Sequence, residues 1–266
     1  MKRAIGVALV WILAMAAGGA ARAASTILKN DDTVINVKMA RWVEADGVYS
    51  IVTTAGTSIQ LGPNQIKEMD FDKPAKFGLA EEQFSNRQYD AALSSLDSVI
   101  TEYRRMQWDV QARGMSAEIL LKKNESKKAY AILEPLFAPG SKAGAVPAEV
   151  QLLYWKVMLV SPERIAQLRK ALEEAIGTGN RDTVAAAYLV RGTMNRGSGQ
   201  REAAVMDYLR VVVLFENVRA AHSEAMYMAS EVLDELKDPR ADELRRRLIE
   251  KYSDSDFAES ARKKGA

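Results

Sequence analysis

The chain has 266 residues, of which 48% are hydrophobic and 27% charged, and it contains no cysteine. This composition is too apolar for a disordered chain, and it excludes scaffolds that depend on disulfides or on cysteine-bound zinc. The 37 basic and 35 acidic residues nearly balance. Because a basic excess is what draws proteins onto nucleic acid or anionic membranes, we expect neither as a partner.

Residues 1–23 have the layout of a secretory signal peptide. Lys2 and Arg3 precede an apolar run from Ala4 to Ala17, and Ala21-Arg22-Ala23 offers small residues for a cut after Ala23. An uncleaved anchor is the alternative, because the 18 apolar or small residues from Ala4 to Ala21 reach the lower edge of a membrane span. Either outcome exports the rest of the chain. We expect a periplasmic or secreted protein, with no stable membrane insertion after cleavage.

Residues 24–73 have the pattern of a small all-β module. Alternating and β-branched residues occupy 33–37, 48–53 and 58–61, with turn signals at Asp46-Gly47 and Ala55-Gly56. The module resembles the Sm-like mini-barrel that precedes helical repeats in some exported bacterial proteins, which implies a barrel-like sheet. Two roles are open: a cap on the first helical repeat, or binding of a glycan or peptidoglycan with the repeats as a spacer. Trp42 suits the core of this module better than a ligand platform.

From Pro74 onward apolar residues recur with the period of a helix, and the pattern repeats. The stripe Ala92, Leu93, Leu96, Val99, Ile100, Tyr103 has the same offsets as Ala204, Val205, Tyr208, Val211, Val212, Phe215. Partial copies begin at Ala129 and Ala241. These four alanines are separated by 37, 75 and 37 residues, so a third repeat belongs in the gap. Its stripe runs two residues out of step: Ile165, Leu168, Ala171, Leu172, Ala175.

A small residue stands twelve positions before each of the four alanines. Because no long side chain separates the backbones there, we expect two antiparallel helices to approach closely at each of these sites. The four small residues are Ala80, Ala117, Gly192 and Ala229.

Two phrases carry a family resemblance: NRQYDAALSSLDSVI (residues 86–100) and GSGQREAAVMDYLRVVV (residues 197–213). Both resemble the second helix of the tetratricopeptide repeat, and units of 37 residues resemble those of exported bacterial members of that family. The resemblance covers Pro74 to Lys263 and implies a mainly α fold, a right-handed α-solenoid of about five helix pairs. The expected units are 74–104, 108–138, 147–176, 182–216 and 219–252, with a capping helix at 254–263.

The same resemblance implies that the first helices line a groove for a peptide or helix of a partner. Phe77, Glu81 and Ser85 replace the Lys and Asn pattern of carboxylate-clamp members, so we do not expect recognition of a free C-terminus. Apolar anchors such as Trp155 and Phe84 would hold the segment, unless they fill the solenoid core instead. The expected groove residues are Phe84, Glu118, Lys122, Trp155, Met158, Thr193 and Arg196.

Catalytic patterns are missing from the sequence. With one histidine, His222, and no cysteine, the sequence excludes most pairs of nucleophile and base and nearly all transition-metal sites. There is no phosphate-binding loop, and the run Arg245-Arg246-Arg247 is typical of a solvated helix face. We therefore expect no enzyme, no cofactor and no metal, but a non-enzymatic scaffold or adaptor that binds another protein of the cell envelope.

Overall fold

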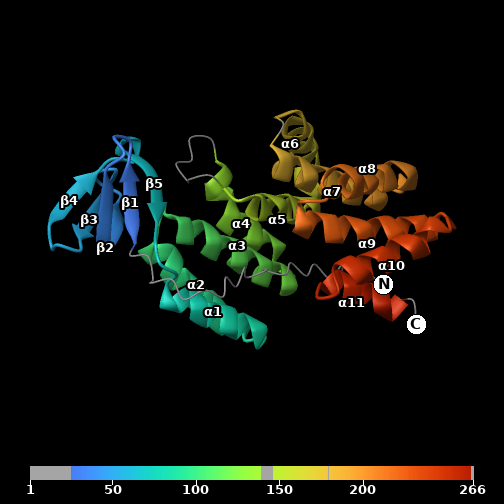
Figure 1. Cartoon of the computed structure of the whole chain (residues 1–266), viewed down its shortest axis with the longest axis horizontal. Helices are drawn as coiled ribbons and strands as arrows, with labels where there is room; N and C mark the ends of the chain where they lie inside the picture. Colours follow the sequence, from blue (N-terminus) through green and yellow to red (C-terminus); the bar gives the residue numbers. More distant parts are fainter. Residues whose placement is uncertain (1–24, 139–145, 179, 265–266) are drawn as a thin grey trace. The chain divides into compact units, whose positions relative to one another are not determined.

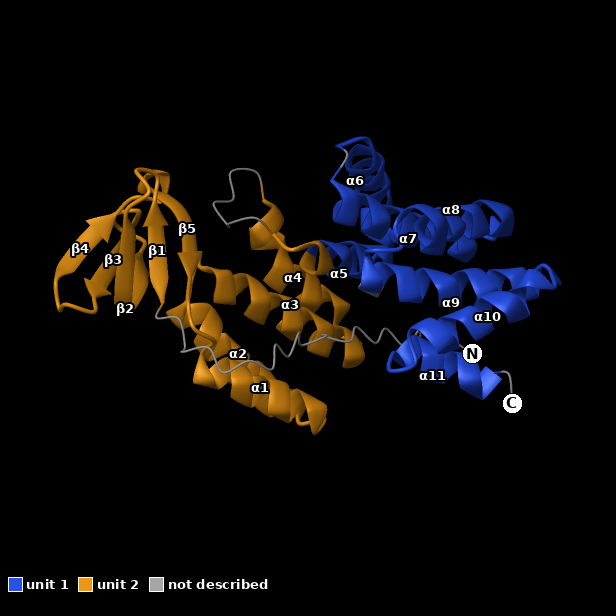
Figure 2. Cartoon of the chain, in the orientation of Figure 1, with its two compact units in different colours: residues 1–13, 151–266 blue, residues 14–150 orange. Residues whose placement is uncertain are grey.

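The computed structural model describes residues 25–138, 146–178 and 180–264 (Figure 1). These residues contain five strands and eleven α-helices, so the chain is mainly helical with an N-terminal antiparallel sheet. The expected signal peptide and its cleavage site lie outside the described residues. The chain divides into two compact units, one ending at Val150 and the other beginning at Gln151 (Figure 2).

The N-terminal sheet has the strand order β4-β3-β2-β1-β5 and is antiparallel throughout. The Asp-Gly and Ala-Gly signals mark its hairpins, where Gly47 and Gly56 have φ values of 63° and 85°. The ladder ends at β4 and β5, so the described strands form an open sheet where a barrel-like module was expected. The strands are β1 (Thr26–Lys29), β2 (Val34–Val43), β3 (Val48–Thr53), β4 (Ser58–Leu61) and β5 (Ile66–Asp70).

The sheet shares its core with the helices that follow in the same unit. Met106 is buried among the apolar side chains of the strands, which include Ile27 and Ile51. Tyr49 Oη donates a hydrogen bond to the carbonyl of Arg105 at 3.0 Å, and Trp108 Nε1 donates to the carbonyl of Phe71 at 2.8 Å. These contacts join the sheet to residues 103–108 of the helical part, and the choice between a cap and a ligand-binding module stays open.

The helical part consists of successive helix pairs, which confirms the expected fold class. Helix α1 packs on α2, α3 on α4, α7 on α8 and α9 on α10. The hand of the solenoid stays a prediction. The helices of the first unit are α1 (Ala75–Ser85), α2 (Tyr89–Glu102), α3 (Gln107–Lys122) and α4 (Ser126–Phe137); α5 (Ala148–Leu159) crosses the boundary; α6 (Ile165–Thr178), α7 (Arg181–Gly197), α8 (Arg201–Leu214), α9 (Arg219–Glu235), α10 (Arg240–Lys251) and α11 (Asp256–Lys264) follow.

The small residues stand where the paired helices approach each other, as expected. Ala80, Ala117 and Ala229 are completely buried. Gly192 on α7 faces Tyr208 on α8, and a Cβ atom added there would lie 2.6 Å from the tyrosine ring. Since that distance is far below van der Waals contact, glycine alone fits beside this ring.

The third repeat shows the shift that its stripe predicted. Leu168, Leu172 and Ala175 of α6 are buried, whereas Ala166, which falls at the regular spacing, is exposed. The helix therefore turns the displaced stripe toward the core, and α6 packs against α7. A short 3₁₀ helix at Pro162–Arg164 precedes α6.

The turn inside a helix pair is the same in four repeats. Each first helix ends with one residue at positive φ: Arg87 at 59°, Asn124 at 61°, Gly199 at 78° and Lys237 at 58°. In repeat one the next residue, Gln88, donates its N–H to the carbonyl of residue 83, which closes the helix end. The sharp turn brings the second helix back against the first.

Candidate functional site

Three of the expected groove residues meet on the first helices of adjacent repeats. Lys122 of α3 places its Nζ 5.7 Å from the centre of the Phe84 ring on α1, within reach of a cation–π interaction. The same Nζ lies 3.8 Å from Oε1 of Glu118, one turn back on α3. Lys122 thus joins an aromatic face on one repeat to a carboxylate on the next.

These three side chains differ in how far a partner can reach them. Phe84 is half-buried and packs on Tyr89, with ring centres 6.0 Å apart. The Lys122 side chain is 28% exposed, whereas the Glu118 residue is only 2% exposed. Phe84 and Lys122 therefore form the accessible surface. Glu118 is buried beside them and forms an ion pair with Lys122. We call Phe84, Glu118 and Lys122 the α1–α3 site.

Trp155 and Met158 lie in the core and not on a surface. They are 3% and 1% exposed, and their neighbours on α5, Val157 and Leu153, are buried as well. This is the alternative that the sequence left open for Trp155. Burial removes both side chains from the set that a partner could contact.

Thr193 and Arg196 both lie on α7 and are already engaged. The Thr193 hydroxyl accepts a hydrogen bond from Tyr208 Oη at 3.1 Å. Arg196 forms an ion pair with Glu235 on α9 at 2.5 Å and lies 4.0 Å from Glu231. Arg196 joins the first helices of repeats four and five, as Lys122 joins those of repeats one and two, but without an aromatic anchor.

A buried ion pair that was not predicted from the sequence joins α5 and α9. Lys156 Nζ contacts both carboxylate oxygens of Glu224 at 2.7 and 2.8 Å, and the two side chains are 10% and 7% exposed. A charged residue within the apolar run VQLLYWKVML was the available signal, because burying a lone lysine is so unfavourable that it implies a partner.

A second missed cluster lies between α7 and α8. Asp207 is 2% exposed and accepts hydrogen bonds from Arg191 at 2.7 and 2.9 Å, from Asn195 at 3.1 Å and from Arg210 at 2.7 Å. Four donors satisfy one buried carboxylate, and both guanidinium groups also lie over the Tyr188 ring. The arrangement is a structural clamp between the two helices of repeat four.

His222 has the geometry of a structural residue. It is 2% exposed, its Nε2 lies 3.0 Å from the carbonyl oxygen of Val212, and its Nδ1 lies 2.8 Å from the Tyr252 hydroxyl. If Nε2 donates to the carbonyl, Nδ1 accepts from the tyrosine, so the neutral ring satisfies both contacts. Burial lowers the pKa of His222 and so favours that neutral form. With both nitrogens engaged, this residue has no free atom for catalysis.

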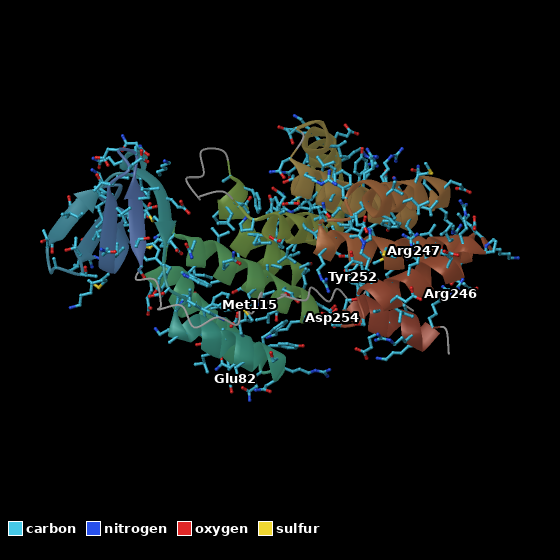
Figure 3. The ribbon with its side chains drawn as sticks, in the orientation of Figure 1. Glu82, Met115, Arg246, Arg247, Tyr252 and Asp254 are labelled. Carbon is cyan, nitrogen blue, oxygen red and sulfur yellow. The ribbon has the colours of Figure 1, made fainter. Side chains whose placement is uncertain are left out.

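The run of three arginines on α10 divides into different environments. The Arg245 side chain is 11% exposed and pairs with Asp234 and Asp242, whereas Arg246 is 72% exposed and extends into solvent (Figure 3). Arg245 occupies the stripe position that Leu96 holds in repeat one. Only part of the run is therefore a solvated face.

Within the described residues no group of three or more His, Cys, Asp or Glu side chains is placed to hold a metal ion.

Among the same residues, no helix has both the length and the apolar character to cross a membrane. Trp42 is half-buried, with Arg105 at 4.4 Å over its ring and Tyr49 at 4.9 Å beside it, so much of the ring is already in contact with the protein.

Helix pairs, four of them with a small residue at the close approach and the same turn, and a 37-residue spacing define a protein of tetratricopeptide-like repeats preceded by an antiparallel sheet. No protein-family model and no curated protein matches the chain. Among solved structures the chain is similar to "YrrB: a TPR protein with an unusual peptide-binding site", with 19% identity and a TM-score of 0.40 over 72% of this chain and 92% of that one. A likeness of this size carries no argument about what this chain binds.

Proposed function

We propose that this protein is an exported, non-enzymatic scaffold whose repeats bind a peptide or helical segment of another cell-envelope protein. The observation that supports this most is the α1–α3 site. There, a half-buried aromatic ring and a partly exposed cation stand together on the first helices of two neighbouring repeats. Such a pair offers an apolar anchor with a charge beside it, and aromatic anchors that fill a partner's pocket carry much of the binding energy in protein interfaces.

The chemistry of the site sets the segment that fits. The Phe84 ring would receive an apolar side chain of the partner, and the Lys122 ammonium would receive a carboxylate or a helix C-terminus. Because Trp155 and Met158 are buried, anchoring depends on Phe84 to a greater extent than the sequence implied.

The test is a pull-down from envelope extract with the tagged chain and two variants. The first combines Phe84→Ala with Lys122→Ala, and the second is Leu79→Ala. Leu79 is 47% exposed on the same helix α1, so its variant matches the loss of apolar surface at a different position. We expect one partner to be lost with the double variant and retained with Leu79→Ala.

Equal recovery of every partner by all three proteins would contradict the α1–α3 site. A thermal unfolding curve for each variant checks that the helix pair remains intact. Activity assays on the recovered complex should show no turnover that depends on this chain.

Export is part of the same proposal and has its own measurement. The apolar run and the small residues before Ala24 support it. N-terminal sequencing of the protein from the cell should begin at Ala24. A chain that retains Met1 in the cytoplasmic fraction would contradict export, and one that retains it in the membrane fraction would support the anchor.

A further inference from the structure

Strand β2 is longer than the strand that covers one of its edges. On that edge β1 pairs with Val34 to Asn36, and the Val37 N–H donates to the carbonyl of Ser25 at 2.7 Å. On its other edge β2 pairs with β3 as far as Val43. Among the described residues, no strand pairs with the β1-facing edge of Lys38–Val43. Backbone N–H and C=O groups along such an edge are a template for another strand.

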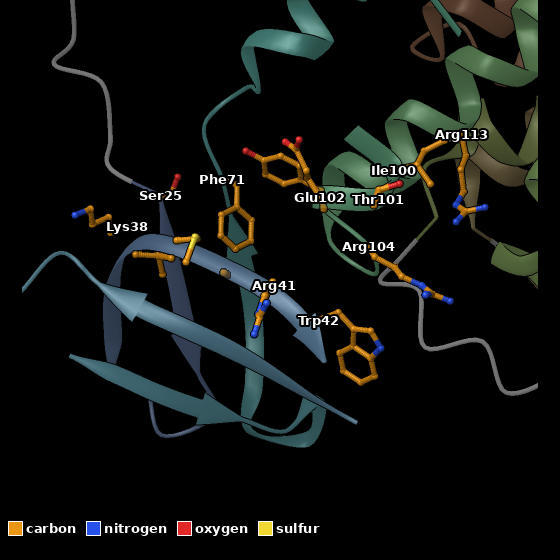
Figure 4. A pocket seen from close by; sticks show the side chains of 14 residues that line it. Ser25, Lys38, Arg41, Trp42, Phe71, Ile100, Thr101, Glu102, Arg104 and Arg113 are labelled. Carbon is orange, nitrogen blue, oxygen red and sulfur yellow. The ribbon is translucent and has the colours of Figure 1, made fainter. Parts of the chain in front are cut away.

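A pocket of about 700 Å³ lies beside this open edge, within the first unit (Figure 4). One wall is β2 from Val37 to Trp42, and the other is the end of α2 with the turn that follows it, residues 100–104. Phe71 closes one end of the space. The pocket therefore follows the free strand edge and gives room for a chain to lie along it.

The lining is cationic. Four basic side chains, Lys38, Arg41, Arg104 and Arg113, line it against a single acid, Glu102, which already pairs with Lys76 at 2.5 Å. Arg104 lies 3.5 Å from Glu44, and Arg113 bonds to Asp109 at 2.6 Å. Lys38 and Arg41 are exposed and form no ion pair with a described residue.

We propose that the edge Lys38–Val43 binds an extended segment of a partner protein as an added β-strand, in which acidic and apolar residues alternate. Side chains on successive residues of a strand point to opposite sides. Lys38 and Arg41 are three residues apart, but the register shift between Val37 and Met39 inserts Lys38 as an extra residue and so breaks the strict alternation. In this proposal both basic side chains therefore lie on one side, and one set of the partner's side chains carries the carboxylates that pair with them. The other set would be apolar and pack toward Ile100, Tyr103 and Phe71.

The charges also make this edge selective, so that it would pair with some strands and not with others. Lysine and an irregular register protect sheet edges from chance pairing, and β2 has both, since its pairing with β3 shifts between Val37 and Met39. The carboxylates of an acidic strand would pair with Lys38 and Arg41, whereas a basic strand would be repelled by them. This surface is separate from the α1–α3 site, so the inference stands independently of the proposed function.

The probe is a capped, fluorescein-labelled peptide of ten residues that alternates Val and Glu, measured by fluorescence anisotropy against the chain from Ala24 to Ala266. We expect saturable binding, and binding at least about tenfold weaker for a Val and Lys peptide. Two further Val and Glu peptides carry N-methyl groups on alternate residues, in the two possible registers. In one of these peptides the methyl groups replace the N–H hydrogens that face β2, and this peptide should not bind. In the other peptide the methyl groups face away from β2, and binding should be retained.

The protein variant combines Lys38→Glu with Arg41→Glu. It should bind the acidic peptide at least about tenfold more weakly and should gain affinity for the Val and Lys peptide. The matched control combines Lys127→Glu with Lys128→Glu, which makes the same charge change at exposed positions of α4 outside the pocket. The control should bind the acidic peptide within about twofold of wild type.

Several results would overturn the proposal. Equal binding of both N-methylated peptides would show electrostatic attraction without strand addition, and absence of binding at millimolar peptide would remove the site. Self-association of the chain that disappears in the Lys38→Glu and Arg41→Glu variant would assign the edge to a second copy. Binding by the chain from Ala24 but not by the chain from Met1 would assign it to the protein's own preceding segment.

Discussion

Repeats one and four have the same apolar stripe and fill it differently. In repeat one, Ala80 on α1 faces a second helix that carries Leu96; in repeat four, Gly192 on α7 faces Tyr208 at the equivalent position. Both larger side chains are completely buried. A bulkier residue on one helix is therefore matched by the loss of a Cβ atom on the other, which keeps the helix pair closely packed.

The polar contact between the paired helices differs in the same way. Ser95 donates to the side chain of Gln83 at 2.9 Å in repeat one. At the equivalent positions of repeat four, Asp207 accepts from Asn195, and Arg191 and Arg210 join the contact. Equivalent positions thus hold a neutral contact in one repeat and a charged contact in the other. The charged version needs more partners, because an ionised carboxylate is costly to bury alone.

The largest expected effect comes from breaking the charged version. Asp207→Ala leaves two guanidinium groups and an amide without their acceptor and should lower the free energy of unfolding by about 2 to 3 kcal/mol. Ser95→Ala removes one neutral hydrogen bond at a half-buried site and should cost less than about 1 kcal/mol. Urea unfolding of both variants checks this, and equal losses would mean that the two contacts are equivalent.

Adding a Cβ atom at the close approach should come next. Gly192→Ala forces an atom to 2.6 Å from the Tyr208 ring and should destabilise by about 1 to 3 kcal/mol, although alanine is the better helix former. Adding Tyr208→Leu recreates the pair of repeat one and should recover part of the loss. A double-mutant cycle in urea measures the coupling; purely additive losses would refute the matched packing.

Repeats one and four also differ in the residue at their turns, where we expect smaller effects on stability. The position at positive φ is Arg87 in repeat one and Gly199 in repeat four. Because a side chain strains this conformation, Gly199→Arg should cost about 1 kcal/mol. Arg87→Gly should relieve strain but also loosen the unfolded chain, so its gain should be smaller. Thermal unfolding of the two variants tests the pair, and a stabilising Gly199→Arg would contradict it.

His222 extends the comparison to repeat five as a pH effect. Its pKa is lowered in the folded chain by burial, so protonation favours the unfolded state. The stabilisation is therefore fully present above the unfolded value of about 6.5 and is lost as the pH falls through the lower folded value. In His222→Gln, which retains an N–H for the Val212 carbonyl, this component of the pH dependence should be missing. Identical pH profiles in urea would contradict the assignment.

The fold was predictable because one physical rule repeats. Six apolar positions with a small residue twelve before them specify two helices and their contact, and even the displaced stripe of α6 was visible as a shift of two residues. The edge of β2 that stays unpaired among the described residues could not be predicted, because it depends on how far β1 pairs along β2 and not on the alternation in β2 itself.

The site was predictable only in part. The family resemblance implied that Phe84 and Lys122 lie on adjacent first helices, and the structure brings them together. It did not reveal that Trp155 and Met158 are buried, because α5 is apolar on nearly every side and its sequence gives no exposed face. Buried partners such as Lys156 and Glu224 are 68 residues apart, beyond the reach of local periodicity.

The most direct test of the scaffold function places a photo-crosslinking phenylalanine derivative at position 84, and in a second protein at position 79. Irradiation in cells should attach a partner protein at position 84 and give little product at position 79 on the other side of α1. Equal crosslinking at both positions, or none at position 84 while the partner still binds, would contradict the α1–α3 site as the binding surface.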